Sequence, residues 1–276
     1  MKNNETHHPV TPIRTPAAYV GGKRQLSRRL VELIANTPHD LYAEAFVGMG
    51  GVFLKRTAQP RYEVINDFNG EVATLFRILQ RHYTPFMEML RYQLTSRREF
   101  ERLKASDPST LTDLERAARF LYLQRLAFGG KVTGQNFGTD PSKRFNITRL
   151  GPILEDVHER LSNVVIESLP WQAFIDRYDR AGALFYLDPP YWGSEGDYGS
   201  KLFAADQFAM LAGRLARIQG TFVLSINDTP ETRALFSPFE LLPAELTYTI
   251  GAGKPLMAHE LIITGPKRSG NTAAPR

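Results

Sequence analysis

The sequence predicts an α/β protein with an open, mostly parallel sheet, helices on both faces, two antiparallel strands at its end and a mostly helical insertion. Two observations predict this fold. Short apolar runs typical of strands alternate with segments of helical spacing in the first 80 residues, and they do so again after residue 164. Between these parts, residues 83–128 show helical spacing without a strand pattern.

The first part of the chain predicts a helix followed by two strands and a second helix. Apolar residues have helical spacing in residues 24–36, and residues 41–46 form a short extended run. A second such run, 62–65, precedes a segment in which Val72, Leu75, Phe76 and Leu79 share one helical face. These segments supply the first half of an α/β sheet.

The remaining segments are predicted in the same way. Residues 129–149 contain several glycines and a proline between polar side chains, which indicates a long loop or irregular hairpin. The apolar run 183–187 is typical of a buried parallel strand. The other predicted elements are a strand at 164–167, helices at 171–178 and around 208–215, a strand at 221–226, and an antiparallel pair at 246–250 and 260–264.

These patterns divide the chain into four parts. We expect a flexible arm over residues 1–16, a discontinuous sheet domain over 17–75 and 165–266, an insertion over 76–164, and a disordered tail over 267–276. The net charge is +5, and the insertion holds all of this excess, with 15 basic against 10 acidic residues, whereas the rest holds 19 of each. A basic segment between neutral ones suits contact with nucleic acid, although a solvated helical surface explains it too.

Composition excludes several classes of protein. The chain has no cysteine, which excludes disulfides and thiolate metal sites, and its six histidines show no ligand spacing, so we predict no metal site. No apolar run approaches the roughly 20 residues that span a bilayer, so a membrane role is not expected. The polar N-terminus lacks the pattern of a secretory signal. We therefore expect a cytoplasmic location.

Asp188-Pro189-Pro190-Tyr191 directly follows the predicted buried strand, which places its carboxylate at the edge where open sheets bind ligands. Two prolines remove two N–H donors and leave carbonyl oxygens as acceptors. An aromatic amine is a weak nucleophile, and acceptors such as Asp188 and the Pro189 carbonyl would localise its lone pair. Tyr191 offers a flat face for a planar base. The pattern therefore favours catalysis on an amine of a nucleobase over a plain proline-rich turn.

Residues 44–51, Glu-Ala-Phe-Val-Gly-Met-Gly-Gly, follow the strand at 41–46, and their glycines allow a ligand to approach the backbone. Asp67 lies 19 residues after Gly48, close to the roughly 20-residue offset at which an acidic group meets ribose hydroxyls in dinucleotide folds. No Walker-type lysine follows, so a nucleoside without phosphates, such as S-adenosylmethionine, fits best. Its carboxylate would meet the positive end of a helix after residue 50, and Phe46 would pack against its adenosine or its sulfonium cation.

Two further segments carry weaker signals. Residues 19–23, Tyr-Val-Gly-Gly-Lys, place an aromatic ring, a tight turn and a cation just before the first helix. Residues 225–228, Ser-Ile-Asn-Asp, end another predicted strand and would line the same crevice. Either segment is equally well explained as an ordinary turn or capped loop.

Together these segments resemble the Dam-like class of N6-adenine DNA methyltransferases, over nearly the whole chain. Ala45 stands where that class usually has proline, and Tyr19 replaces a common tryptophan. Residues 66–69 and 259–263 are similar to its ribose-binding and closing motifs. The resemblance implies a Rossmann-like sheet that uses S-adenosylmethionine, with Asp188, Pro189, Pro190 and Tyr191 as catalytic residues. The cofactor-binding residues that it implies are Tyr19, Gly22, Lys23, Glu44, Phe46, Gly48, Gly50, Asp67, Asn69 and Asp188.

The class places its target-recognition region where the basic excess lies. Residues 120–131 are similar to the Tyr-x-x-Arg-x-x-Phe-Gly stretch of the class, but the next loop lacks the Asn-Val-Pro-Phe-Gly pattern of members that read GATC. We therefore expect double-stranded DNA as partner, a site other than GATC, and a monomer or weak dimer in a bacterial or phage-infected cell. The predicted DNA-binding residues are Arg125, Lys131, Asn136, Lys143 and Arg144.

The expected reaction is methyl transfer to adenine N6 after the base leaves the stack. An N4-cytosine methyltransferase is the nearest alternative, because that amine poses the same chemical problem, but a serine at position 188 would favour it. A protein glutamine methyltransferase more often has asparagine there. A DNA-binding protein without catalysis on the same fold is a further alternative, which the intact Asp188 and Asp67 disfavour.

Overall fold

A computed structural model describes residues 7–19, 26–132, 134–138, 145–193, 203, 205–248 and 256–266. Its main feature is a seven-stranded sheet with the strand order β5-β4-β2-β6-β7-β9-β8. The first five of these strands are mutually parallel. They are β5 (Val164–Glu167), β4 (Tyr62–Asn66), β2 (Leu41–Glu44), β6 (Ala183–Leu187) and β7 (Thr221–Asn227). The predicted parallel α/β sheet is thus confirmed.

The last two strands, β8 (Phe239–Tyr248) and β9 (Leu256–Pro266), run antiparallel to each other, and β9 runs antiparallel to β7. This confirms the predicted terminal antiparallel pair, but β8 begins at Phe239, well before the predicted start at residue 246. The strand continues through Pro243, which donates no hydrogen bond. Since β8 lies at the edge of the sheet, this proline is tolerated.

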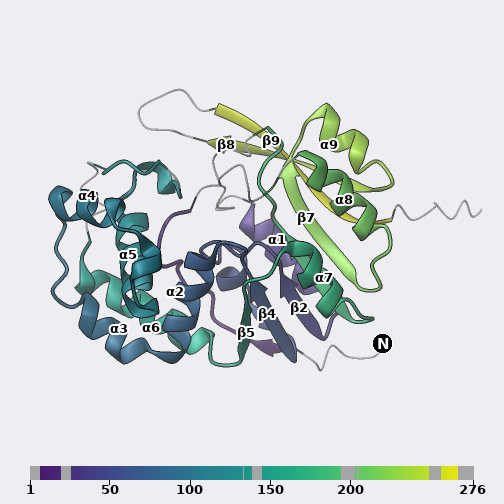
Figure 1. The fold of residues 1–276 in the computed structure, drawn as a ribbon. Coiled ribbons are helices and arrows are strands. Elements are labelled where there is room, and N and C mark those ends of the chain that lie inside the picture. Colours follow the sequence, from purple (N-terminus) through teal and green to yellow (C-terminus); the bar gives the residue numbers. More distant parts are fainter. Residues whose placement is uncertain are drawn as a thin grey trace, which may run out of the picture.

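Side chains alternate between two hydrophobic layers because successive strand residues point to opposite faces. Tyr42 of β2 belongs to one layer and Ala43 to the other. The first layer lies under α1 (Ser27–Asn36) and α2 (Gly70–Arg81), and the second lies under α7 (Trp171–Tyr178), α8 (Ala205–Leu215) and α9 (Pro230–Leu235). Figure 1 shows the helices on both sides of the sheet.

The insertion packs beside α2 and shares the first hydrophobic layer (Figure 1). The predicted boundary at residue 76 lies inside α2, whose buried face continues to Leu79. The helices of the insertion are α3 (Tyr83–Leu90), α4 (Arg97–Ala105), η2 (Pro108–Thr110), α5 (Asp113–Leu126), η3 (Phe128–Gly130) and α6 (Ile147–Arg160). The predicted loop ended at residue 149, but α6 already begins at Ile147, with the Asn146 side chain as its cap.

Part of the predicted flexible arm is instead paired with the body of the protein. Strand β1 (His8–Pro9) pairs antiparallel with β3 (Ala58–Gln59), and the Ile13 amide donates to the Leu54 carbonyl at 2.8 Å. These backbone hydrogen bonds fix residues that carry no apolar pattern, which is why the sequence did not reveal them. Among the described residues, no helix is long and apolar enough to cross a membrane.

Candidate active site

A cavity of about 760 Å³ lies at the carboxyl ends of β2, β4 and β6. In the strand order, β4 lies on one side of β2 and β6 on the other, so this is a point where the chain switches direction across the sheet. The cavity brings together predicted residues from distant parts of the sequence. Those in its lining are Tyr19, Glu44, Phe46, Gly48, Asp67, Asn69, Asp188, Pro190 and Arg125.

Glu44 ends β2 and is almost completely buried, with 2% of its surface exposed. The Tyr42 hydroxyl donates a hydrogen bond to Glu44 Oε2 at 2.6 Å, and the Arg56 guanidinium lies 3.7 Å from the centre of the Tyr42 ring. Burial raises the pKa of Glu44 to about 8, against the opposing effect of the Tyr42 hydrogen bond and the Arg56 charge. The Glu44 carboxyl is therefore mostly protonated at neutral pH unless a cation binds beside it.

The Gly48 turn requires glycine for two reasons. Its φ is +49°, and a side chain here would place its Cβ 2.9 Å from the Tyr19 ring. The ring of Tyr19 thus packs directly on the Gly48 backbone, so the predicted aromatic residue of the 19–23 segment and the glycine turn form one wall of the cavity.

The segment after Gly50 differs from the expectation. Gly50 contacts Leu54 and is absent from the cavity lining, where Gly51 appears instead. The predicted helix after residue 50 is only a three-residue 3-10 turn, η1 (Phe53–Lys55). So short a turn has almost no macrodipole, so a helix N-terminus cannot serve as the anion site here.

Asp67 follows β4 and accepts two backbone hydrogen bonds. The Asn69 amide donates to its Oδ1 and the Gly48 amide to its Oδ2, each at 2.9 Å. Burial raises the pKa of Asp67 to about 6, although both hydrogen bonds oppose this shift. The Asn69 side chain caps α2 by accepting from the Glu71 amide. The β4 turn therefore holds an acidic group against the glycine turn of β2.

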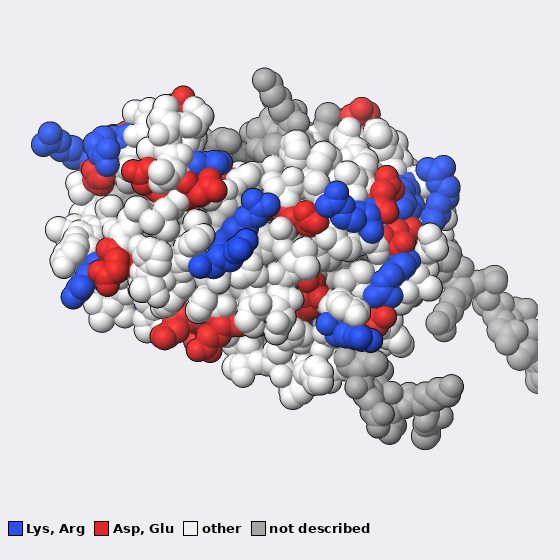
Figure 2. All heavy atoms as spheres, turned by 60° about the horizontal axis from the view of Figure 1, so that its bottom comes forward, with Lys and Arg blue, Asp and Glu red and all other residues white. Residues whose placement is uncertain are grey.

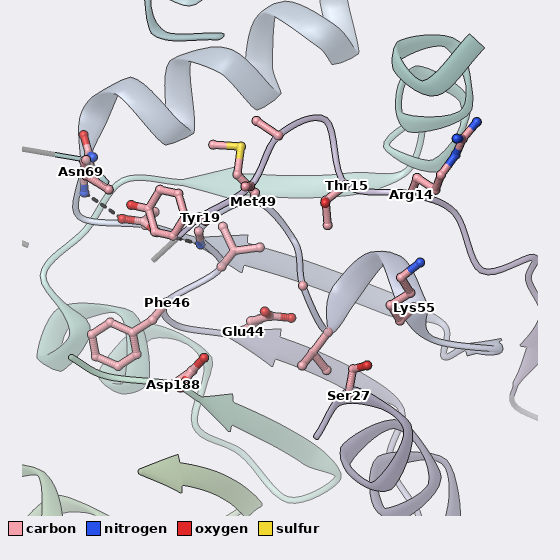
Figure 3. A pocket seen from close by; sticks show the side chains of 18 of the residues that line it. Arg14, Thr15, Tyr19, Ser27, Glu44, Phe46, Met49, Lys55, Asn69 and Asp188 are labelled. Carbon is pink, nitrogen blue, oxygen red and sulfur yellow. Dashed lines mark hydrogen bonds between the residues drawn. The ribbon is translucent and has the colours of Figure 1, made fainter. Parts of the chain in front are cut away.

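Asp188 stands directly after β6, as predicted, and is half-buried at the cavity wall. The Ser225 hydroxyl of β7 donates to Asp188 Oδ1 at 3.1 Å, and the Tyr186 and Ser225 hydroxyl oxygens lie 2.9 Å apart. These contacts aim the carboxylate toward the cavity. Figure 3 shows Asp188 close to Phe46 and Glu44.

The other residues of the predicted catalytic tetrapeptide lie in different surroundings. Pro190 lines the cavity, whereas Pro189 is buried and does not line it. Tyr191 is half-buried, lies outside the lining, and donates a hydrogen bond to Glu260 of β9. Glu260 belongs to the predicted closing motif 259–263, whose partner in the fold the sequence did not reveal.

The predicted DNA-binding residues are only partly brought together. Arg125 lines the cavity and donates to the Pro16 carbonyl at 3.4 Å, while Lys131 and Asn136 are exposed on the segment that follows α5. Burial and the like charge of Arg14 lower the pKa of Arg125. Gly22, Lys23, Lys143 and Arg144 lie outside the described residues.

Sequence reasoning missed the basic side chains at the other end of the cavity. Arg14, Lys55 and Arg149 line it, and none has an acidic partner in an ion pair among the described residues. Figure 3 shows Arg14 and Lys55 on the side away from Asp188 and Phe46. Arg14 lies in the predicted arm and no motif marks any of the three. The cavity is thus acidic at one end and basic at the other.

The sequence matches a known family model and known methyltransferases. The family model for D12 class N6 adenine-specific DNA methyltransferases matches residues 19–250. The chain is 28% identical over 266 residues to Type II methyltransferase M1.LlaDCHI from Lactococcus lactis subsp. cremoris, covering 87% of this chain and 90% of that one. It is 22% identical to Type II methyltransferase M.CviBI from Paramecium bursaria Chlorella virus NC1A, with coverages of 79% and 85%.

Solved structures are similar at a lower level. A precorrin 8w decarboxylase from Methanobacterium thermoautotrophicum has a TM-score of 0.37, 13% sequence identity and 96% coverage of each chain. The family model covers most of the sequence, including all the cavity-lining segments from Tyr19 onward. The chain belongs to the D12 class N6 adenine-specific DNA methyltransferase family.

Proposed function

We propose that the cavity holds S-adenosylmethionine, the methyl donor, together with a target adenine that has left the DNA double helix. The observation that carries this proposal is the position of Asp188, which directly follows β6 and lies in the same cavity lining as Glu44 and Asp67. An acceptor for an amine, Asp188, and acidic groups for a nucleoside cation, Glu44 and Asp67, thus line the same cavity. A base inside a duplex cannot reach such a recess, so the target nucleotide has to be extruded.

The described residues fit S-adenosylmethionine. The cavity volume lies in the range typical of small-molecule sites. Asp67 suits the ribose hydroxyls, the rings of Phe46 and Tyr19 offer apolar and π surfaces, and Glu44 suits a cationic group. The helix predicted after residue 50, whose positive end would meet the carboxylate of S-adenosylmethionine, is replaced by the short turn η1. Arg14 and Lys55, at the basic end of the cavity, are therefore the side chains that suit this carboxylate.

The titration of Glu44 makes cofactor binding depend on pH. The unliganded carboxyl, with a pKa of about 8, binds a proton at neutral pH, and a cation beside it favours the ionised form. We expect the affinity for S-adenosylmethionine to rise between pH 6.5 and 8, by up to about tenfold per pH unit. Calorimetry at pH 7 in buffers of different ionisation enthalpy should detect proton release on binding.

Glu44→Gln is the control for this dependence, because its amide oxygen can still accept from Tyr42. The variant should bind more weakly at pH 8 and release fewer protons at pH 7. An unchanged proton release would contradict the assignment to Glu44.

The chemistry follows from the acceptors at the β6 edge. S-adenosylmethionine, when bound, supplies an electrophilic methyl group on a sulfonium. The Asp188 carboxylate accepts from the N6 amine, which localises its lone pair, and the Asp188 charge stabilises the positive charge that develops on this nitrogen. Ser225 keeps the carboxylate in place. Holding both reactants in one cavity lowers the entropic barrier.

The insertion supports DNA binding through phosphate contacts. Arg125, Lys131 and Asn136, together with Lys143 and Arg144, are the proposed contacts, and Arg125 also reaches the cavity. Figure 2 shows one face on which basic and acidic side chains are interspersed. Because the target base has to enter the cavity, we place the DNA at the cavity mouth. We also propose that the protein acts as a monomer or weak dimer, in the cytoplasm, as part of a restriction-modification system.

The function is tested by incubating the protein with double-stranded DNA and S-adenosylmethionine that carries a labelled methyl group. Chromatography of the hydrolysed DNA should show the label in N6-methyladenine. Label in N4-methylcytosine would favour the cytosine alternative, and unlabelled DNA would favour a non-catalytic DNA-binding protein. Methylation-sensitive sequencing of DNA from cells expressing the protein gives the recognition site.

A further inference from the structure

Two residues on adjacent antiparallel strands contact the chain just after the catalytic aspartate. Asn227 ends β7 and Glu260 lies in β9, and these two residues are direct cross-strand partners. One contacts Trp192 and the other contacts Tyr191. Nothing in the expected cofactor or DNA contacts requires either residue.

Glu260 binds the Tyr191 side chain from within the protein. Only 1% of the Glu260 surface is exposed, although it is an acidic residue, and its Oε1 accepts a hydrogen bond from the Tyr191 hydroxyl. Buried carboxyls are costly and are retained where a specific partner uses them. The contact joins β9 to the far end of the Tyr191 ring and restrains the position of that end.

Asn227 fixes the backbone of the next residue. Its Oδ1 accepts from the Trp192 amide at 2.9 Å, and its Nδ2 donates to the Trp192 carbonyl at 3.0 Å. A side-chain amide that pairs with both polar groups of one residue restricts the position and the rotation of that peptide. The Trp192 ring also packs on Phe208, with 5.1 Å between ring centres. The backbone after Tyr191 is thus held independently of the Tyr191 hydroxyl.

We infer that Glu260 and Asn227 are positioning residues that hold Tyr191 in the orientation required to stack on the target adenine. The inference rests on the proposed function, because it needs a base beside Asp188. A ring anchored only through its Cβ can rotate about two torsions, whereas the Glu260 hydrogen bond restrains its distal end and Asn227 restrains its backbone. Stacking on a base then loses less side-chain entropy, because the ring is already ordered.

The experiment uses two variants that each remove one partner of the hydrogen bond between Tyr191 and Glu260. Glu260→Ala removes the acceptor, and Tyr191→Phe removes only the hydroxyl and keeps the ring. Each variant should lower kcat/KM for DNA by roughly tenfold, with an unchanged Kd for S-adenosylmethionine. The double variant should be no slower than either single one, because both changes remove the same bond.

Three comparisons separate positioning from a structural effect. Glu260→Gln keeps an acceptor oxygen and should restore most of the activity. Glu240→Ala removes an exposed strand glutamate that contacts Thr264, and it should leave activity unchanged. With 2-aminopurine at the target position, and S-adenosylhomocysteine in place of the donor, both Glu260→Ala and Tyr191→Phe should alter the fluorescence of the extruded base.

The outcomes distinguish this inference from the proposed function. If the unmodified protein transfers no methyl group, the proposed function fails. If it transfers methyl groups and Glu260→Ala does so at the same rate, only the positioning role is overturned. Additive losses in the double variant, or an equal loss of affinity for S-adenosylmethionine, would also overturn it.

Discussion

Replacing Asp188 by alanine is expected to lower methyl transfer to DNA by about a thousandfold. The carboxylate that directly follows β6 is the charged acceptor of the proposed catalytic tetrapeptide, and the Ser225 hydroxyl donates to one of its oxygens at 3.1 Å. Its loss removes the group that stabilises developing positive charge on N6. Transfer of labelled methyl groups to DNA, measured at saturating DNA and S-adenosylmethionine, gives this effect as a change in kcat.

Binding measurements separate the catalytic loss from a loss of cofactor. Glu44, Asp67 and Tyr19 remain in the lining, so Asp188→Ala should still bind S-adenosylmethionine, although more weakly. Asp228→Ala is the matched control, because Asp228 pairs with Arg233 outside the lining, and its activity should stay close to that of the unmodified protein. Unchanged turnover in Asp188→Ala would show that this aspartate is not the catalytic group.

Replacing Glu63 by glutamine should lower the free energy of unfolding by about 3–5 kcal/mol. Glu63 of β4 is 2% exposed and accepts from Arg56 and twice from Arg160, the latter at 2.6 and 2.8 Å. Arg160 ends α6, so this cluster joins the insertion to the sheet. Without the carboxylate, two nearly buried guanidinium groups face each other uncompensated.

Thermal and denaturant unfolding would measure this effect, with a melting temperature lower by on the order of 10 °C. The exposed Arg28–Glu32 pair supplies the control, since Glu32→Gln should cost less than about 1 kcal/mol. A Glu63→Gln effect as small as that of Glu32→Gln would mean that solvent or a nearby group compensates the two arginines.

Much of the fold could be predicted because the sequence patterns that mark its strands and helices involve only neighbouring residues. The apolar run of β6 is buried along its whole length, and the segments at 164–167 and 171–178 match β5 and α7 in their bounds. The location of three site residues could also be predicted, because parallel strands that end at one edge of the sheet bring Glu44, Asp67 and Asp188 to one cavity.

The differences arise where a long-range contact overrides a local pattern. His8 and Pro9 of the predicted arm are held by backbone pairing between β1 and β3, which no side-chain period records. Strand β8 extends through Pro243 because it lies at a sheet edge, and α6 tolerates Pro152 within its length. The segment after Gly50 tightens into η1 instead of a helix, which is why we propose basic side chains of the cavity as the anion site.

The sequence by itself determined the parallel sheet, the residues that end its strands and the family, because periodicity and short motifs are properties of neighbouring residues. Only the tertiary structure decided which distant residues come together. It places Arg14 in the cavity lining, Ser225 against Asp188, and Glu260 against Tyr191. These contacts depend on the register of β6, β7 and β9. That register is set by burial across the whole sheet, which no single segment of the sequence encodes.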